Sequence, residues 1–205
     1  MIFRTIIENL SFSQKIKLKD NLFFIGSCFS DNIGNKLSNF GLNCTINPYG
    51  ATYNPISVCK VLENIYKNSN ISSKEIIEKN GIFNSLLHHS FVYGNSEKEL
   101  KEKINSNNYN HKKNLDESNF IFITLGTSWV YEYLETEEIV NNCHKLPSSS
   151  FKRYNLTIEE IIEAFDNLFN KCKNLKNKKI IFTTVFKIII KILRFLKIYW
   201  FFSNF

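Results

Sequence analysis

Short hydrophobic runs bounded by polar residues divide the chain into regular units. Runs of this kind, closed by glycine or by polar clusters, predict buried β-strands. Strands are expected at 22–25, 42–46, 120–125 and 179–184. The first and third runs end at Gly26 and Gly126, and a hydroxyl-bearing residue follows each glycine. Two strands thus finish in the same kind of turn.

Apolar residues at helical spacing predict helices between these strands. The first expected helix carries Ile33, Leu37 and Phe40 on one face, with Asp31 placed to cap it. A second is expected around 58–65. Capping boxes predict further helix starts at Ser72/Glu75, Ser96/Glu99 and Thr157/Glu160. Because strands alternate with helices, the expected fold class is α/β with a parallel sheet.

Length and composition are those of one folded domain. The 205 residues, 43% of them hydrophobic, are enough for a single core. The cysteines are odd in number, irregularly spaced and lack a CxxC pair, so neither a disulfide framework nor a zinc site is predicted. They are Cys28, Cys44, Cys59, Cys143 and Cys172. We expect reduced thiols in the cytoplasm, no metal and no cofactor.

The charge balance adds little to this interpretation. A formal net charge of +7 raises the question of a nucleic-acid partner. No recognition motif accompanies the charge, so a solvated basic surface is the better interpretation and nucleic acid is not an expected partner.

The first glycine turn offers a nucleophile. Gly26 permits a tight turn directly after a strand, which presents Ser27 and Cys28 near the backbone N–H groups of the next helix. A thiol there is activated by the helix N-terminus and a neighbouring histidine, and a hydroxyl depends still more on such a base. A buried structural cysteine is the alternative.

The second glycine turn could stabilise an oxyanion. Gly126, Thr127 and Ser128 supply a backbone amide and hydroxyls at the end of their strand. The alternative is a plain turn with Trp129 in the core. In an open parallel sheet, ligands bind beyond the carboxyl ends of the strands, where both turns would lie.

Three histidines are candidates for acid–base work. His144 follows Asn142 in a polar segment before a proline and is a usable acid, base or ligand. His88 and His89 are adjacent and would point to opposite faces of a strand, so at most one can reach a shared site. The other is expected to be structural.

These segments, in this order, resemble the GSCFA family, which looks like a branch of the SGNH (GDSL-type) hydrolase superfamily. The resemblance covers 22–183 and rests on FIGSCFSDNIG, NPYGATYNP, HHSF, TLGTSWVYE and NNCHKLP, with Ser30 where the family motif has alanine. It implies a three-layer, flavodoxin-like SGNH-hydrolase fold with a central parallel sheet. It also implies hydrolysis or transfer of the acyl group of a small-molecule or glycan-linked ester.

The resemblance assigns roles to individual residues. Cys28 takes the place of the superfamily's serine nucleophile and Ser27 that of the preceding aspartate, so Cys28 is favoured and Ser27 competes with it. Gly50 stands for the glycine of the second block, and Gly126 with Ser128 for the glycine and asparagine of the third, although the asparagine itself is missing. The expected catalytic residues are Cys28, Ser27 and His144, and the expected oxyanion or substrate-binding residues are Gly50, Gly126, Thr127, Ser128, His89 and Asn142.

The carboxyl end departs from the superfamily pattern. The DxxH-type block that supplies the catalytic histidine is not found after Thr183. We therefore expect an incomplete domain over 1–184 and an aberrant basic and hydrophobic tail over 185–205, produced by a frameshift or premature stop. Activity would be impaired or lost, with His144 and His89 as the only substitute bases. The competing hypothesis is a non-catalytic binding module.

A second interpretation takes the tail at face value. Four cations recur every three or four residues opposite isoleucine, leucine and phenylalanine: Lys187, Lys191, Arg194 and Lys197. This is the pattern of a helix lying on an anionic membrane surface.

Overall fold

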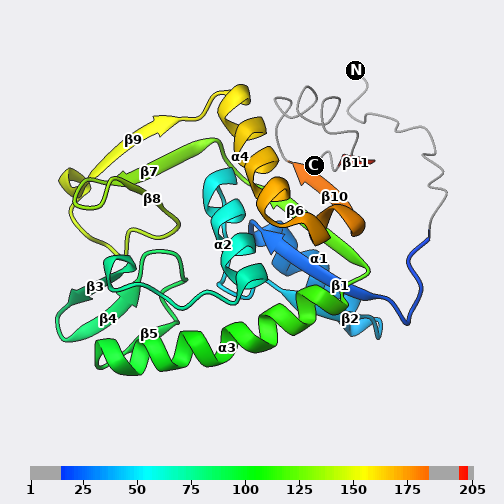
Figure 1. Ribbon diagram of the computed structural model, residues 1–205, viewed down its shortest axis with the longest axis horizontal. Coiled ribbons are helices and arrows are strands. Elements are labelled where there is room, and N and C mark those ends of the chain that lie inside the picture. Colours follow the sequence, from blue (N-terminus) through cyan, green and yellow to red (C-terminus); the bar gives the residue numbers. More distant parts are fainter. Residues whose placement is uncertain (1–14, 185–198, 203–205) are drawn as a thin grey trace, which may run out of the picture.

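The computed structural model, which describes residues 15–184 and 199–202, is built on a five-stranded parallel sheet (Figure 1). Its strands are β1 (Asn21–Gly26), β2 (Asn43–Ile46), β6 (Phe120–Leu125), β10 (Lys179–Thr184) and β11 (Tyr199–Phe202). They lie side by side in the order β11-β10-β6-β1-β2. Counted along the chain this is the flavodoxin-like order 2-1-3-4-5. The expected α/β fold with a central parallel sheet is confirmed.

Helices cover both faces of the sheet, which makes three layers (Figure 1). Leu22 and Phe24 of β1 belong to a core cluster with α1 (Cys28–Asn39) on one face. Phe23 and Ile25 belong to the larger cluster with α2 (Pro55–Lys67) and α4 (Ile158–Lys171) on the other. A strand buried on both faces needs a continuous apolar run, which is how β1 was recognised. The long helix α3 (Glu97–Glu117) packs against α2.

Helix starts differ from prediction at two places. Ser27, not Asp31, is the N-cap of α1, and Phe40 is 77% exposed because the helix ends at Asn39. The Ser72/Glu75 box is formed, but it opens only the 3₁₀ turn η1 (Ser73–Glu75), which runs directly into a strand. The capping box therefore marked a turn correctly without marking a helix. Ser96 and Thr157 do cap α3 and α4, as expected.

Two small antiparallel sheets were not predicted. One contains β3 (Ile76–Lys79), β4 (Ile82–Ser85) and β5 (Tyr93–Gly94). The other contains β7 (Trp129–Tyr133), β8 (Glu138–Val140) and β9 (Phe151–Asn155). Single 3₁₀ segments, η2 (Ser148–Ser150) and η3 (Lys173–Asn177), precede β9 and β10. Both sheets lie on the side of the central sheet at which β1 ends (Figure 1).

The end of the chain is only partly described. Tyr199–Phe202 form β11, which pairs in parallel with β10 at the edge of the sheet. These four residues are a strand and not part of the surface helix expected there. The remainder of that expectation, 185–198 and 203–205, lies outside the described residues. Within 15–184 and 199–202, no helix combines the length and the apolar character needed to cross a membrane.

Gly26 lets β1 end against the backbone of β6. Its φ is +139°, and a Cβ there would overlap the backbone of Thr124. We expect Gly26→Ala to lower the free energy of unfolding by more than about 3 kcal/mol, because strained backbone adds to steric overlap. Urea denaturation measures this loss.

Gly81→Ala is the matched control, since Gly81 also has a positive φ of +76° but a Cβ there would meet no atom within 4 Å. Backbone strain alone should cost this variant about 1 kcal/mol. Equal losses in the two variants would contradict a special contact at Gly26.

Candidate functional site

The two glycine turns lie next to each other. Strands β1 and β6 are paired, with Gly26 opposite Thr124. A Cβ built on Gly126 would lie 3.0 Å from the Cβ of Ser27 and 3.0 Å from the ring of Tyr53. The turns therefore converge where the strand order reverses, which is the usual ligand position in open parallel sheets.

Cys28 is the accessible candidate of the first turn. It is the first residue of α1 and is exposed. Ser27 is only 4% exposed, and its hydroxyl accepts the Phe29 N–H at 3.4 Å as the helix cap. A molecule from solvent can thus approach the Cys28 thiol, whereas the Ser27 hydroxyl is buried and caps α1.

Asn47 holds the first glycine turn in place, and sequence reasoning did not identify it. The Gly26 N–H donates to Asn47 Oδ1 at 2.8 Å, and Asn47 Nδ2 donates to Asp31 Oδ1 at 2.7 Å. Asn47 is 5% exposed and has a φ of 39°, a conformation that asparagine tolerates well. The available signal was an asparagine directly after a strand and before Pro48.

The segment 47–55 closes over both turns. The Thr52 N–H donates to the Gly26 carbonyl at 2.8 Å. The N–H groups of Gly126 and Thr127 both donate to the Tyr53 carbonyl, at 2.9 and 3.2 Å. The backbone donors expected to form an oxyanion hole are therefore already engaged in this structure.

Other donors remain near the second turn. The Thr127 hydroxyl accepts the Trp129 N–H at 3.0 Å, which leaves its own proton available. The Ser128 hydroxyl donates to Asn155 Oδ1 at 3.1 Å. At the start of α1, the Phe29 N–H donates to Ser27 Oγ and the Ser30 N–H to the Ser27 carbonyl, so of these first three N–H groups that of Cys28 is the remaining candidate donor. An oxyanion would rely on Thr127 and the start of α1.

His144 is not joined to either nucleophile candidate by a hydrogen bond in the described part of the chain. Its ring Nε2 lies 2.7 Å from the Ser85 carbonyl oxygen. Its backbone N–H donates to Asn142 Oδ1 at 3.0 Å. Burial lowers the pKa of His144, and hydrogen bonds to backbone carbonyls oppose the shift. Asn142 in turn donates to the His88 carbonyl at 3.4 Å. Both residues shape their loop.

His88 is a structural histidine, as expected for one of the adjacent pair. It is 4% exposed, its ring stacks on Tyr49 with 3.8 Å between centroids, and its Nδ1 lies 2.8 Å from Ser85 Oγ. Burial lowers the pKa of His88 to about 3, with smaller contributions from His111 and His144. Its imidazole therefore stays neutral near neutral pH.

His89 is exposed and contacts the segment 47–55. Its N–H donates to the Tyr49 carbonyl at 2.8 Å, and a Cβ on Gly50, whose φ is +87°, would overlap the His89 side chain. Gly50 thus permits a close approach of the two segments.

Asn141, not singled out from sequence, donates to the carbonyls of Ala51 and Leu87 at 3.1 and 3.3 Å.

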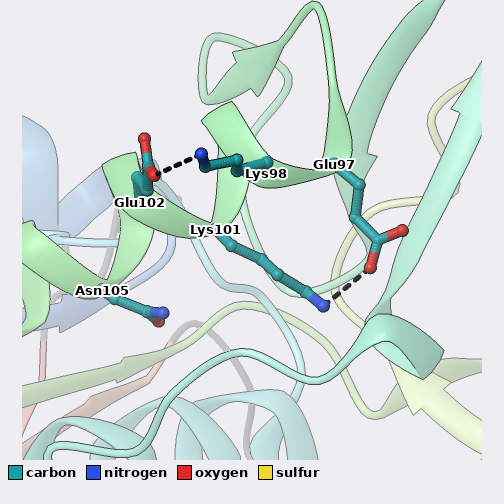
Figure 2. Close-up of a pocket in the computed structure, with 5 residues that line it drawn as sticks. All are labelled: Glu97, Lys98, Lys101, Glu102 and Asn105. Atoms are coloured by element: carbon teal, nitrogen blue, oxygen red, sulfur yellow. Dashed lines mark ion pairs between the residues drawn. The ribbon is translucent and has the colours of Figure 1, made fainter.

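A surface hollow of about 400 Å³ lies elsewhere, on α3 (Figure 2). It is lined by Glu97, Lys98, Lys101, Glu102 and Asn105. Lys101 pairs with Glu97 at 2.7 Å and Lys98 with Glu102 at 3.9 Å. The hollow contains none of the expected site residues. No group of three or more His, Cys, Asp or Glu side chains in the described ranges could hold a metal ion.

Comparison with known proteins supports the segments singled out above. The model described as the GSCFA family matches residues 21–185, which include both glycine turns and every candidate site residue. No curated protein and no solved structure matches the chain.

The buried His88 makes stability depend on pH. Between about pH 4.5 and 6.5 the unfolded chain binds a proton at this residue that the folded chain, with its pKa of about 3, does not. The free energy of unfolding should therefore fall on acidification, by at most about 1.4 kcal/mol per pH unit for this group. Urea denaturation at several pH values measures the slope.

His88→Asn should flatten this slope, and His89→Asn, which alters the exposed neighbour, should keep it. Identical slopes in the two variants would show that the proton is bound elsewhere.

Proposed function

The chain belongs to the GSCFA family, and from this premise we propose that it is an acyl esterase or acyltransferase of the SGNH type with Cys28 as nucleophile. The observation that carries the proposal is the convergence of the two glycine turns at the reversal of strand order, with the exposed Cys28 at the start of α1. The substrate would be a small-molecule or glycan-linked acyl ester.

The reaction would proceed through a thioester. Cys28 Sγ forms a bond to the acyl carbon while the ester C–O bond breaks, and the alcohol leaves with a proton. Water or an acceptor hydroxyl then attacks the thioester, which releases the acid or a new ester and returns the thiol. Negative charge on the tetrahedral intermediate would be stabilised by the start of α1 and the Thr127 hydroxyl.

Tyr53 suits the mouth of such a site. Its side chain is 44% exposed, and its ring lies close to Gly126. Burial raises the pKa of Tyr53, and its proximity to Cys28 and Asp31 raises that pKa further. The phenol therefore keeps its proton and can donate a hydrogen bond to a leaving oxygen.

Turnover should be slow because no histidine is hydrogen-bonded to Cys28 among residues 15–184 and 199–202. The Ser85 carbonyl accepts the Nε2–H of His144 at 2.7 Å, so Nδ1 is the nitrogen that could accept a proton, and no hydrogen bond joins it to Cys28 among the described residues. This observation favours the second candidate function, a non-catalytic module that binds the ester without cleaving it. The cytoplasmic location and the membrane-surface contact of 185–205 stay predictions.

Hydrolysis of p-nitrophenyl butyrate distinguishes the two functions. We expect Cys28→Ala to reduce the rate to the uncatalysed background, because the nucleophile is removed. Ser27→Ala should retain activity and lose about 1 kcal/mol of stability as a cap variant. Cys44→Ala, which removes a half-buried thiol in β2, is the control and should match the wild type.

Intact-protein mass spectrometry should also detect one added butyryl group that is lost in Cys28→Ala. A rate that Ser27→Ala alone removes would make Ser27 the nucleophile. A rate that neither substitution changes would leave the binding module as the function.

A further inference from the structure

An arginine lies over two aromatic rings on the sheet formed by β7, β8 and β9. The guanidinium of Arg153 lies over the ring of Trp129 at 4.0 Å and over that of Tyr131 at 5.7 Å. Trp129 and Tyr131 are 40% and 39% exposed, although tryptophan was a candidate for the core here. We call these three residues the Arg153 platform.

The strand register explains why the three side chains meet. Trp129 and Tyr131 are two residues apart on β7, so they point to the same face. Arg153 on β9 is the direct partner of Tyr131, which places it on that face as well. Residues on the opposite face, such as Val130, pack into the main core. The platform therefore lies on the solvent-facing side of a sheet whose other face packs into the main core.

The guanidinium is oriented but has no acidic partner among the described residues. Ion pairs within 15–184 and 199–202 are all formed by lysines. A guanidinium over an aromatic face keeps the N–H groups at its edge available, and its delocalised bonding keeps them in one plane. Such an edge forms paired hydrogen bonds with a carboxylate or phosphate. The arrangement is complementary to a ligand oxyanion.

The second glycine turn connects the platform to the proposed active site along the chain. Gly126, Thr127 and Ser128 are all partly exposed, and they connect the end of β6 to Trp129. Three residues of chain reach at most roughly 10 Å. The Ser128 hydroxyl also bonds to Asn155, two residues from Arg153 on the same strand. A substrate lying over Gly126 can thus extend along this strip to the arginine.

We propose that the Arg153 platform binds an anionic group, carboxylate or phosphate, carried by the acyl-ester substrate beyond its scissile bond. This inference rests on the proposed function and names its substrate class: esters with a second, negatively charged end. The aromatic rings hold the guanidinium in place, and the guanidinium selects the charge.

Two esters of similar size test the selection. The substrates are neutral p-nitrophenyl butyrate and mono-p-nitrophenyl glutarate, which carries a carboxylate. Arg153→Gln should lower the ratio of kcat/KM for the anionic ester to that for the neutral ester by about tenfold or more. Arg153→Lys should lower it less, because the charge remains and the planar fork is lost.

Lys152→Gln is the matched control. It removes the same charge from the adjacent residue, whose side chain contacts the Tyr154 ring on the other face of the strand. This variant should keep the wild-type ratio. An equal drop in both variants would overturn the proposal, because it would reflect net charge alone.

Calorimetric titration tests binding without relying on turnover. Glutarate should bind the wild type more tightly than neutral glutaramide at low salt, and Arg153→Gln should abolish the preference. Glycerol phosphate, compared with glycerol, shows whether phosphate is the better anion. If no ester is turned over in a Cys28-dependent way, the proposed function fails, and these titrations still decide on Arg153. Equal binding of every anion and its neutral partner would overturn the platform.

Discussion

The close approach of β1 to β6 at Gly26 is the contact on which the site depends. A residue with a side chain would push the end of β1 away from Thr124, and the N-cap of α1 would move with it. The Ser27 N–H completes the junction by donating to the Thr124 carbonyl at 3.0 Å. The positions of the end of β1, the start of α1 and Cys28 therefore all depend on this contact.

Hydrogen bonds between buried hydroxyl groups also stabilise this junction. Ser30 is fully buried at the position where the family motif has alanine, and its hydroxyl lies 2.9 Å from that of Thr124. Thr124 in turn lies 2.6 Å from the Thr183 hydroxyl on β10. Each hydroxyl has a partner, so burial carries no penalty for an unsatisfied group. The chain's departure from the motif is accommodated by a contact that reaches across the sheet.

The segment 47–55 is held by contacts on both of its sides. The segment 47–55 is bound to the first turn through Asn47 and Thr52, and to the histidines through Tyr49 and Gly50. Two histidines contact this segment: the ring of His88 stacks on Tyr49, and the His89 N–H donates to the Tyr49 carbonyl. Cys28 is exposed, but no histidine among the described residues is hydrogen-bonded to it. Arg153 has no acidic partner within 15–184 and 199–202.

The sequence by itself determined the α/β class, four strands of the parallel sheet and the two glycine turns, because burial on both faces leaves a continuous apolar run in a strand. Only the tertiary structure decided that Asn47 holds Gly26, that His144 bonds to Ser85 and that Trp129 faces solvent. The two antiparallel sheets were likewise apparent only from the tertiary structure. Hydropathy periodicity reports which local positions are buried. It does not report which distant segment supplies the partner, and Gly26 and Asn47 are separated by 21 positions while His144 and Ser85 are separated by 59.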